Sequence, residues 1–131
     1  MQDRPTVQEL LAAVRGFLDD DVIPGLEGRR RFHALVASNV LAIVGRELAT
    51  EETALVDEWQ ALSRLLGHPA GEPPARLDAL RAAVRAASEE LAERIRRGDA
   101  DGEPFASAVR AHAREVVREK LRVANPRYLG G

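Results

Sequence analysis

The chain has 131 residues, no cysteine and a formal net charge of −2 at pH 7. Its length fits one domain, and the lack of cysteine excludes disulfides, thiolate metal ligands and a cysteine nucleophile. The near-neutral charge argues against general nucleic-acid binding, which needs a basic surplus or a basic face. No N-terminal stretch joins basic residues to an apolar segment, so no secretory signal is predicted and the protein is expected in the cytoplasm.

A first helix is predicted over residues 6–21. Thr6 and Glu9 stand at the spacing of a capping box, and apolar side chains then recur at helical spacing. The helix would end at Asp19–Asp21, where three carboxylates meet the negative end of the helix dipole. A solvated or salt-bridged corner is the ordinary interpretation. A divalent-metal site is the alternative, but it lacks further oxygen ligands at a suitable spacing.

The second predicted helix, residues 28–48, is the centre of the expected fold. From Phe32 to Gly45 the chain runs fourteen residues without a charge. This stretch is shorter than the roughly 20 apolar residues that a membrane span needs, and charges close both of its ends. It therefore predicts the buried central helix of a soluble domain and no contact with a membrane. Gly28 and three arginines at its start suit a phosphate or carboxylate, although an interhelix salt bridge is the ordinary interpretation.

Three further helices are predicted at residues 51–66, 75–97 and 104–123. Thr50 is interpreted as the cap of the first of these helices, and a Pro/Gly-rich loop at residues 67–75 follows it. The acidic run after residue 98 resembles a calcium loop, but it lacks the glycine and the glutamate of that motif, so no metal site is predicted. The resulting prediction is an all-α, single-domain bundle, residues 1–131, of about five helices around a buried second helix.

Several polar residues lie where chemistry is expected. His33 and His112 fall on apolar faces, and such histidines are ordinarily core residues; two of them make no metal site without a third ligand. Asn39 falls inside an apolar arc and would need partners there; the C-terminal Asn-Pro-Arg-Tyr turn is the expected source. The predicted surface for a ligand or a partner comprises Arg29, Arg31, His33, Asn39, Asn125, Arg127 and Tyr128. No catalytic residue is assigned, because the chain lacks the GxSxG, phosphate-loop, dinucleotide and HExxH motifs.

The GRxRFH pattern at Gly28–His33, Asn39 and the NPRY of Asn125–Tyr128 support a resemblance. Over nearly its whole length except the 67–75 loop, the chain resembles a family of small bacterial proteins of unassigned domain function. Members are typically encoded beside aminoglycoside-phosphotransferase-like kinases and acyl-CoA dehydrogenases. Some are implicated as the small partner of such a kinase in phosphorylating 4-hydroxyacyl-CoA esters. One departure is Ala124, where many relatives are expected to carry an acidic residue.

Two functions are carried forward. The resemblance implies a non-catalytic accessory partner, without a cofactor, of a phosphotransferase-like kinase that acts on hydroxyacyl-CoA in fatty or hydroxy acid catabolism. The alternative is a small-molecule-binding or catalytic helical bundle whose anion site uses arginine, histidine and asparagine. An acyl-CoA or phosphate-bearing ligand fits either function, whereas neither nucleic acid nor a membrane is an expected partner.

Overall fold

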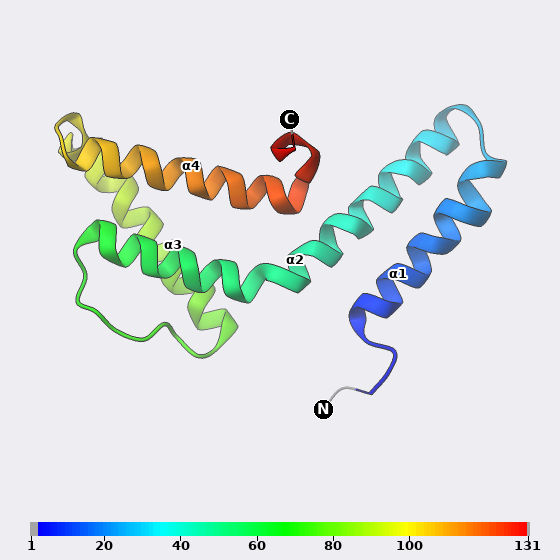
Figure 1. Cartoon of the computed structure of the whole chain (residues 1–131), viewed down its shortest axis with the longest axis horizontal. Helices are drawn as coiled ribbons and strands as arrows, with labels where there is room; N and C mark the ends of the chain where they lie inside the picture. Colours follow the sequence, from blue (N-terminus) through cyan, green and yellow to red (C-terminus); the bar gives the residue numbers. More distant parts are fainter. Residues whose placement is uncertain (1–2, 131) are drawn as a thin grey trace. The chain divides into compact units, whose positions relative to one another are not determined.

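The computed structural model describes residues 3–130, which are all-helical and contain no strand (Figure 1). The all-α prediction is therefore confirmed. The chain groups into two compact units, unit 1 (Met1–Ala49) and unit 2 (Thr50–Gly131), so the division falls inside α2. The α-helices of the described residues are α1 (Val7–Phe17), α2 (Gly28–Leu66), α3 (Leu77–Arg96) and α4 (Phe105–Ala124). Shorter turns are a π-helix at Leu18–Val22 and 3₁₀ turns at Ile23–Gly25, Asp99–Asp101 and Pro126–Leu129.

The expected count of five helices is wrong by one. The predicted second and third helices, 28–48 and 51–66, form the single 39-residue helix α2. Thr50, interpreted as a cap, lies inside this helix. The reason is that a capping residue starts a helix without stopping the one before it, and residues 46–66 contain neither glycine nor proline. Alanine, leucine and glutamate around Thr50 are strong helix formers, so the helix continues.

Unit 1 is a hairpin of α1 and the first part of α2, which run antiparallel (Figure 1). The predicted capping box is present. The Thr6 N–H donates to Glu9 Oε2 at 2.7 Å, and the Glu9 N–H donates to Thr6 Oγ1 at 3.2 Å. At the open end of the hairpin, Gln8 Nε2 donates to the carbonyl of Gly45 at 2.9 Å. A Cβ added at Gly45 would lie 3.4 Å from the Gln8 side chain and 3.8 Å from that of Leu11, so the two helices are in contact here.

The burial predicted for the second helix is not confirmed. In the described part of unit 1 only Ile23 and Ser38 are buried. Phe32 is 62% exposed, and Val36 and Val40 are about half exposed. This part of α2 makes contacts at its small residues: Gly45 lies against Gln8 and Leu11 of α1, and Ser38 donates to Asp19 of the π-helix that follows α1. Leu41 and Ile43 are half-buried, whereas most of the other large apolar side chains of this part of α2 are exposed.

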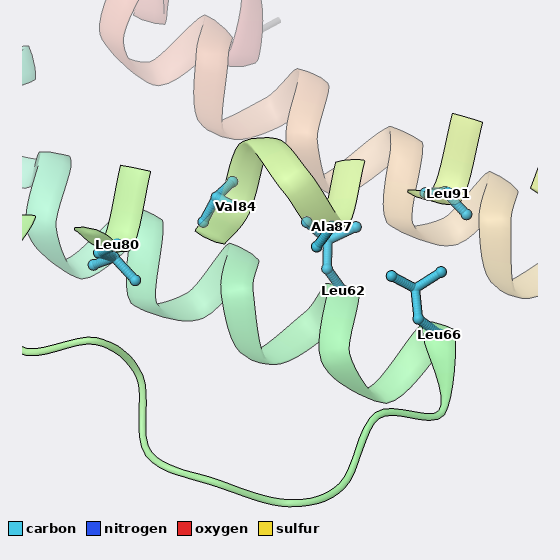
Figure 2. Close-up of a cluster of buried hydrophobic side chains, with 6 residues drawn as sticks. All are labelled: Leu62, Leu66, Leu80, Val84, Ala87 and Leu91. Atoms are coloured by element: carbon cyan, nitrogen blue, oxygen red, sulfur yellow. The ribbon is translucent and has the colours of Figure 1, made fainter. Parts of the chain in front are cut away.

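The hydrophobic core lies in unit 2, between the last part of α2 and α3 (Figure 2). Its buried residues are Leu62 and Leu66 from α2 with Leu80, Val84, Ala87 and Leu91 from α3. The four residues of α3 recur at spacings of three and four, which places them on one side of the helix. Phe105 and Val109 of α4 pack against this cluster, as does half-buried Trp59. Three helices thus share one small core.

A guanidinium group holds the helix ends of unit 2 together. Arg94 Nε donates to Asp99 Oδ2 at 3.2 Å, and Arg94 Nη1 donates to the carbonyl of Leu66, the last residue of α2, at 3.2 Å. The same group lies 4.6 Å from the ring centroid of Phe105, the first residue of α4. Arg94 therefore links α2, α3 and α4. Gly98, with a φ of 88°, makes the left-handed turn that ends α3.

The stability of this corner should depend on pH through Asp99. The hydrogen bond from Arg94, helped by Arg97, holds the pKa of the Asp99 carboxyl below its ordinary value of 3.8. A carboxyl with a lowered folded-state pKa stabilises the fold fully above the unfolded-state value, and this contribution disappears as pH falls through the folded-state pKa. We expect Asp99→Asn to lower the urea midpoint above about pH 4, and the difference from wild type to vanish toward about pH 2.

Asp57→Asn is the matched control, because Asp57 is an exposed carboxylate of α2 without a hydrogen bond or ion pair in the described chain. Its urea midpoint should follow that of the wild type throughout the titration. A constant difference between wild type and Asp99→Asn down to about pH 2 would contradict the role given to the ionised Asp99.

Candidate functional site

The start of α2 carries the first half of the predicted site. Gly28, with a φ of 54°, opens the helix, and Arg29 Nε donates to His33 Nε2 at 3.2 Å, one turn further on. This bond requires a neutral imidazole whose proton is on Nδ1, because Nε2 acts as the acceptor. The His33 ring also meets Phe32 edge to face, with ring centroids 5.7 Å apart. Arg29 and His33 thus form one exposed polar pair.

Arg31 makes a contact within the hairpin. Its Nη1 donates to the carbonyl of Ile23 at 2.8 Å, which ties the turn before α2 to the first turn of that helix. The bond occupies part of the guanidinium group in holding the hairpin. Arg30 is exposed and makes no hydrogen bond or ion pair within residues 3–130.

The acidic corner Asp19–Asp21 is in part salt-bridged, as the ordinary interpretation expected. Asp19 accepts a hydrogen bond from the buried Ser38 hydroxyl at 2.6 Å and lies 3.7 Å from Arg15. Asp20 and Asp21 are exposed, and their carboxylates have no hydrogen bond or ion pair in the described chain. None of the described contacts joins these carboxylates to the arginines at the start of α2.

Asn39 is exposed, which corrects the expectation that it lies in a buried apolar arc. Neighbours in that arc, including Val36 and Val40, are themselves exposed. The Asn39 carboxamide can therefore be satisfied by water and does not require a partner from the C-terminal turn. The desolvation argument that linked the two no longer applies.

The second half of the predicted site follows α4. The Asn125 N–H donates to the carbonyl of Leu121 at 2.8 Å, and the Tyr128 N–H donates to the carbonyl of Asn125 at 3.1 Å. Pro126–Leu129 is a single 3₁₀ turn, and Tyr128 is 76% exposed. The ring does not clamp the tail on the core. The turn instead presents Arg127 and Tyr128 on the surface of unit 2.

The predicted site therefore consists of two halves in different units. Arg29, Arg31, His33 and Asn39 belong to unit 1, and Asn125, Arg127 and Tyr128 belong to unit 2. In the structure, the Arg29 side chain donates a hydrogen bond to the His33 side chain, and the Tyr128 N–H donates a hydrogen bond to the Asn125 carbonyl. The union of the halves in one surface stays a prediction.

The histidines show no metal chemistry in the described residues. His33 is exposed, and His112 is half-buried on α4. His68, which the sequence did not single out, lies with Nε2 2.9 Å from Glu90 Oε2. Within residues 3–130, no group of three or more histidine, aspartate or glutamate side chains could hold a metal ion.

The feature that sequence reasoning missed is an uncovered apolar surface on unit 1. Of the fourteen large hydrophobic side chains that the described chain exposes, ten belong to this unit. Their exposed fractions run from 39% to 62%. We call these ten residues the unit 1 apolar surface: Val7, Leu10, Val14, Phe17, Phe32, Leu35, Val36, Val40, Val44 and Leu48. Helical periodicity showed that these residues form apolar arcs, but it assigned the arcs to a core.

By length and composition alone, α2 also qualifies as a membrane span. It contains an 18-residue window with a mean hydropathy of 1.3, of which 6% is buried. The core helix of a soluble protein and a signal sequence pass the same test, so one such helix is weak evidence for a membrane.

These observations define an all-α protein with a small three-helix core and a helical hairpin that leaves most of its apolar side chains uncovered. Residues 24–128 match a protein family described as a domain of unknown function, DUF6285. The match covers more than half of the chain, and the chain belongs to this family. Searches among curated proteins and among solved structures find no match.

Proposed function

We propose that this protein is a cytoplasmic, non-catalytic accessory subunit of an aminoglycoside-phosphotransferase-like kinase that acts on hydroxyacyl-CoA esters. The observation that carries an accessory role is the unit 1 apolar surface. Ten large hydrophobic side chains of one small unit remain between 39% and 62% exposed. Monomeric soluble proteins rarely expose contiguous apolar patches beyond a few hundred Å², so such a unit favours a component of an assembly over a self-contained catalyst. The kinase as partner rests on the family resemblance.

The polar residues of the two half-sites supply the proposed contact with the kinase. Arg29 and Arg127 are exposed cations, and Tyr128 offers an exposed ring. Arginine, which binds carboxylates in bidentate geometry, and tyrosine are both enriched at protein interfaces. An acidic patch of the kinase, or a phosphate group held by it, would fit these groups.

Co-purification tests the proposal. The tagged chain, expressed with the kinase encoded beside it, is expected to retain that kinase and to raise its rate of hydroxyacyl-CoA phosphorylation. Arg29→Ala combined with Arg127→Ala should weaken the complex about tenfold or more, which corresponds to about 1.4 kcal/mol.

Arg85→Ala is the matched control, because Arg85 is an exposed arginine of α3 outside both half-sites that makes no hydrogen bond or ion pair in the part of the chain that the structure describes. It should leave kinase binding unchanged. A kinase that neither binds the wild-type chain nor changes its activity in its presence would refute the accessory role.

The alternative function, a small-molecule-binding or catalytic bundle, is favoured by the Arg29–His33 pair at the start of α2. It makes a distinct prediction for the purified chain. A CoA ester or nucleotide at 100 times its Kd should stabilise the chain by about 2.7 kcal/mol. The accessory role expects no such shift in the absence of the kinase.

A further inference from the structure

The unit 1 apolar surface consists of two stripes on neighbouring helices. On α1, Val7, Leu10, Val14 and Phe17 recur at spacings of three and four. On α2, five residues recur at a spacing of four, with Leu35 beside them: Phe32, Val36, Val40, Val44 and Leu48. Residues four apart advance about 40° around a helix, so the α2 series winds about its axis, and the part of it that lies beside the α1 stripe is available to pack on another helix pair.

Unit 1 has almost no interior of its own, since Ile23 and Ser38 are its only buried residues within the described chain. Short helices owe most of their stability in water to the packing of an apolar face. The hairpin therefore needs a covering surface that is itself apolar and about as long as two helices.

A second copy of the hairpin has the dimensions that this requires. Residues 28–49 of α2 span about 33 Å and the 11 residues of α1 about 17 Å, so two helices, each about 10 Å wide, give a face on the order of 500 Å². Stable interfaces bury about 800 Å² per partner, and the interfaces of homodimers are enriched in apolar residues. The flat area is smaller than this, and side chains that project from the face bring the buried area nearer to that of a stable interface.

The charges of the two helices favour the same partner. Residues 3–21 hold five acidic and two basic side chains, a net charge of −3. Residues 27–49 hold four arginines and two glutamates, a net charge of +2. In a dimer whose two-fold axis is parallel to the helices, α1 of each copy faces α2 of the other copy. The negatively charged α1 segment therefore meets the positively charged α2 segment at two equivalent places.

This arrangement also gives partners to three charged side chains near the turn of the hairpin. Asp20, Asp21 and Arg30 are exposed and make no hydrogen bond or ion pair in the part of the chain that the structure describes. The axis along the helices places the turns of both copies at one end of the dimer. At that end, Asp20 and Asp21 of each copy lie beside Arg30 of the second copy.

We propose that unit 1 pairs with unit 1 of a second copy through the unit 1 apolar surface, forming a two-fold four-helix bundle in which α1 of each copy packs on α2 of the other. The dimer would cover the surface that supports the accessory role, so kinase binding would then depend on the exposed residues of the two half-sites. Failure of dimerisation and failure of kinase binding are separate results, because the first is measured on the purified chain alone.

Sedimentation equilibrium of the full chain is the primary measurement. We expect a mass twice that of the 14.3 kDa chain at micromolar concentration. Val14→Asp and Val40→Asp should each weaken association about 100-fold, because each would bury an unpaired carboxylate in the interface. Val117→Asp is the matched control, since Val117 is an exposed valine of α4 outside unit 1, and it should leave the dimer intact.

Charge reversal tests the pairing of α1 with α2. Asp21→Arg and Arg30→Asp should each weaken association about tenfold, and the two changes together should restore most of it. A double variant as weak as the single variants would overturn this arrangement of the helices.

A third measurement leaves the apolar surface intact, in case the aspartate variants unfold the hairpin. The chain has no cysteine, so Ala13→Cys, at an exposed position of α1 outside the stripe, accepts a single spin label. Each chain carries one label, so a dipolar signal between labels requires two copies. We expect this signal for a dimer, and we expect dilution with unlabelled protein to remove it. A monomeric mass at about 100 μM and no dipolar signal would overturn the proposal.

Discussion

Leu62→Ala is expected to lower the free energy of unfolding of unit 2 by about 2–5 kcal/mol. Leu62 is fully buried, with 0% of its surface exposed, and it lies at the centre of the cluster in Figure 2. Its removal would take packing contacts from α3, whose residues Leu80 and Val84 belong to the same cluster. The upper part of the range applies if the surrounding helices cannot close the cavity. Because a domain of this size is held by only about 5–15 kcal/mol, this single change would remove a large share of the total.

Urea unfolding followed by circular dichroism measures this loss. Leu129→Ala is the control, because Leu129 is a leucine of the C-terminal 3₁₀ turn that is 41% exposed. It should change stability by about 0.5 kcal/mol or less. Equal losses for Leu62→Ala and Leu129→Ala would mean that the cluster does not hold unit 2 together.

Arg94→Met is expected to have the second largest effect, a loss of about 2–3 kcal/mol, since hydrogen bonds to a charged group are worth about 1.5–3 kcal/mol. The side chain of Arg94 is 28% exposed, so water screens it only in part. Methionine keeps most of the volume but loses both hydrogen bonds, and the Leu66 carbonyl at the end of α2 is left without its side-chain donor. The contact of the cation with the Phe105 ring is lost as well, which adds about 0.5–1 kcal/mol at most.

Arg85→Met is the matched control on the same helix. Arg85 is exposed and makes no hydrogen bond or ion pair within residues 3–130, so its replacement should change stability by about 0.5 kcal/mol or less. Arg94→Lys adds a test of geometry, because an ammonium group cannot donate in two fixed directions as a guanidinium group does. If Arg94→Lys were as stable as the wild type, the positive charge alone would be enough to link α2, α3 and α4, and the two directed hydrogen bonds of the guanidinium group would not be needed.

The candidate site was predictable to a limited degree, residue by residue. At the start of α2, Arg29 contacts His33, which is exposed although a histidine on an apolar face is ordinarily a core residue. The role of Arg31 was not predictable, because its partner is a backbone carbonyl, and every residue carries one. Asn39 was misplaced because its position was judged from its neighbours on the helix wheel, and those neighbours turned out to be exposed.

Sequence alone determined the local features of this fold. The capping box of Thr6 and Glu9, the helix end at Gly67 and the left-handed turn at Gly98 follow from backbone chemistry within a few residues. The continuity of α2 through Thr50 could have been read in the same way, from the absence of glycine and proline there. The residues that form a helix cap lie within about one helical turn of one another. A short stretch of sequence therefore contains all the information that specifies the cap.

Only the tertiary structure decided which apolar arcs are covered. The stripe of α3 around Leu80 and the stripe of α2 around Val40 look alike in the sequence, yet the first is buried and the second is half exposed. Periodicity gives the direction of an apolar arc about its own helix axis, whereas burial depends on which other helix lies against it. That neighbour is set by packing between residues far apart in the chain, such as Leu62 with Leu80 and Gln8 with Gly45, and the pattern of a single helix carries no record of it.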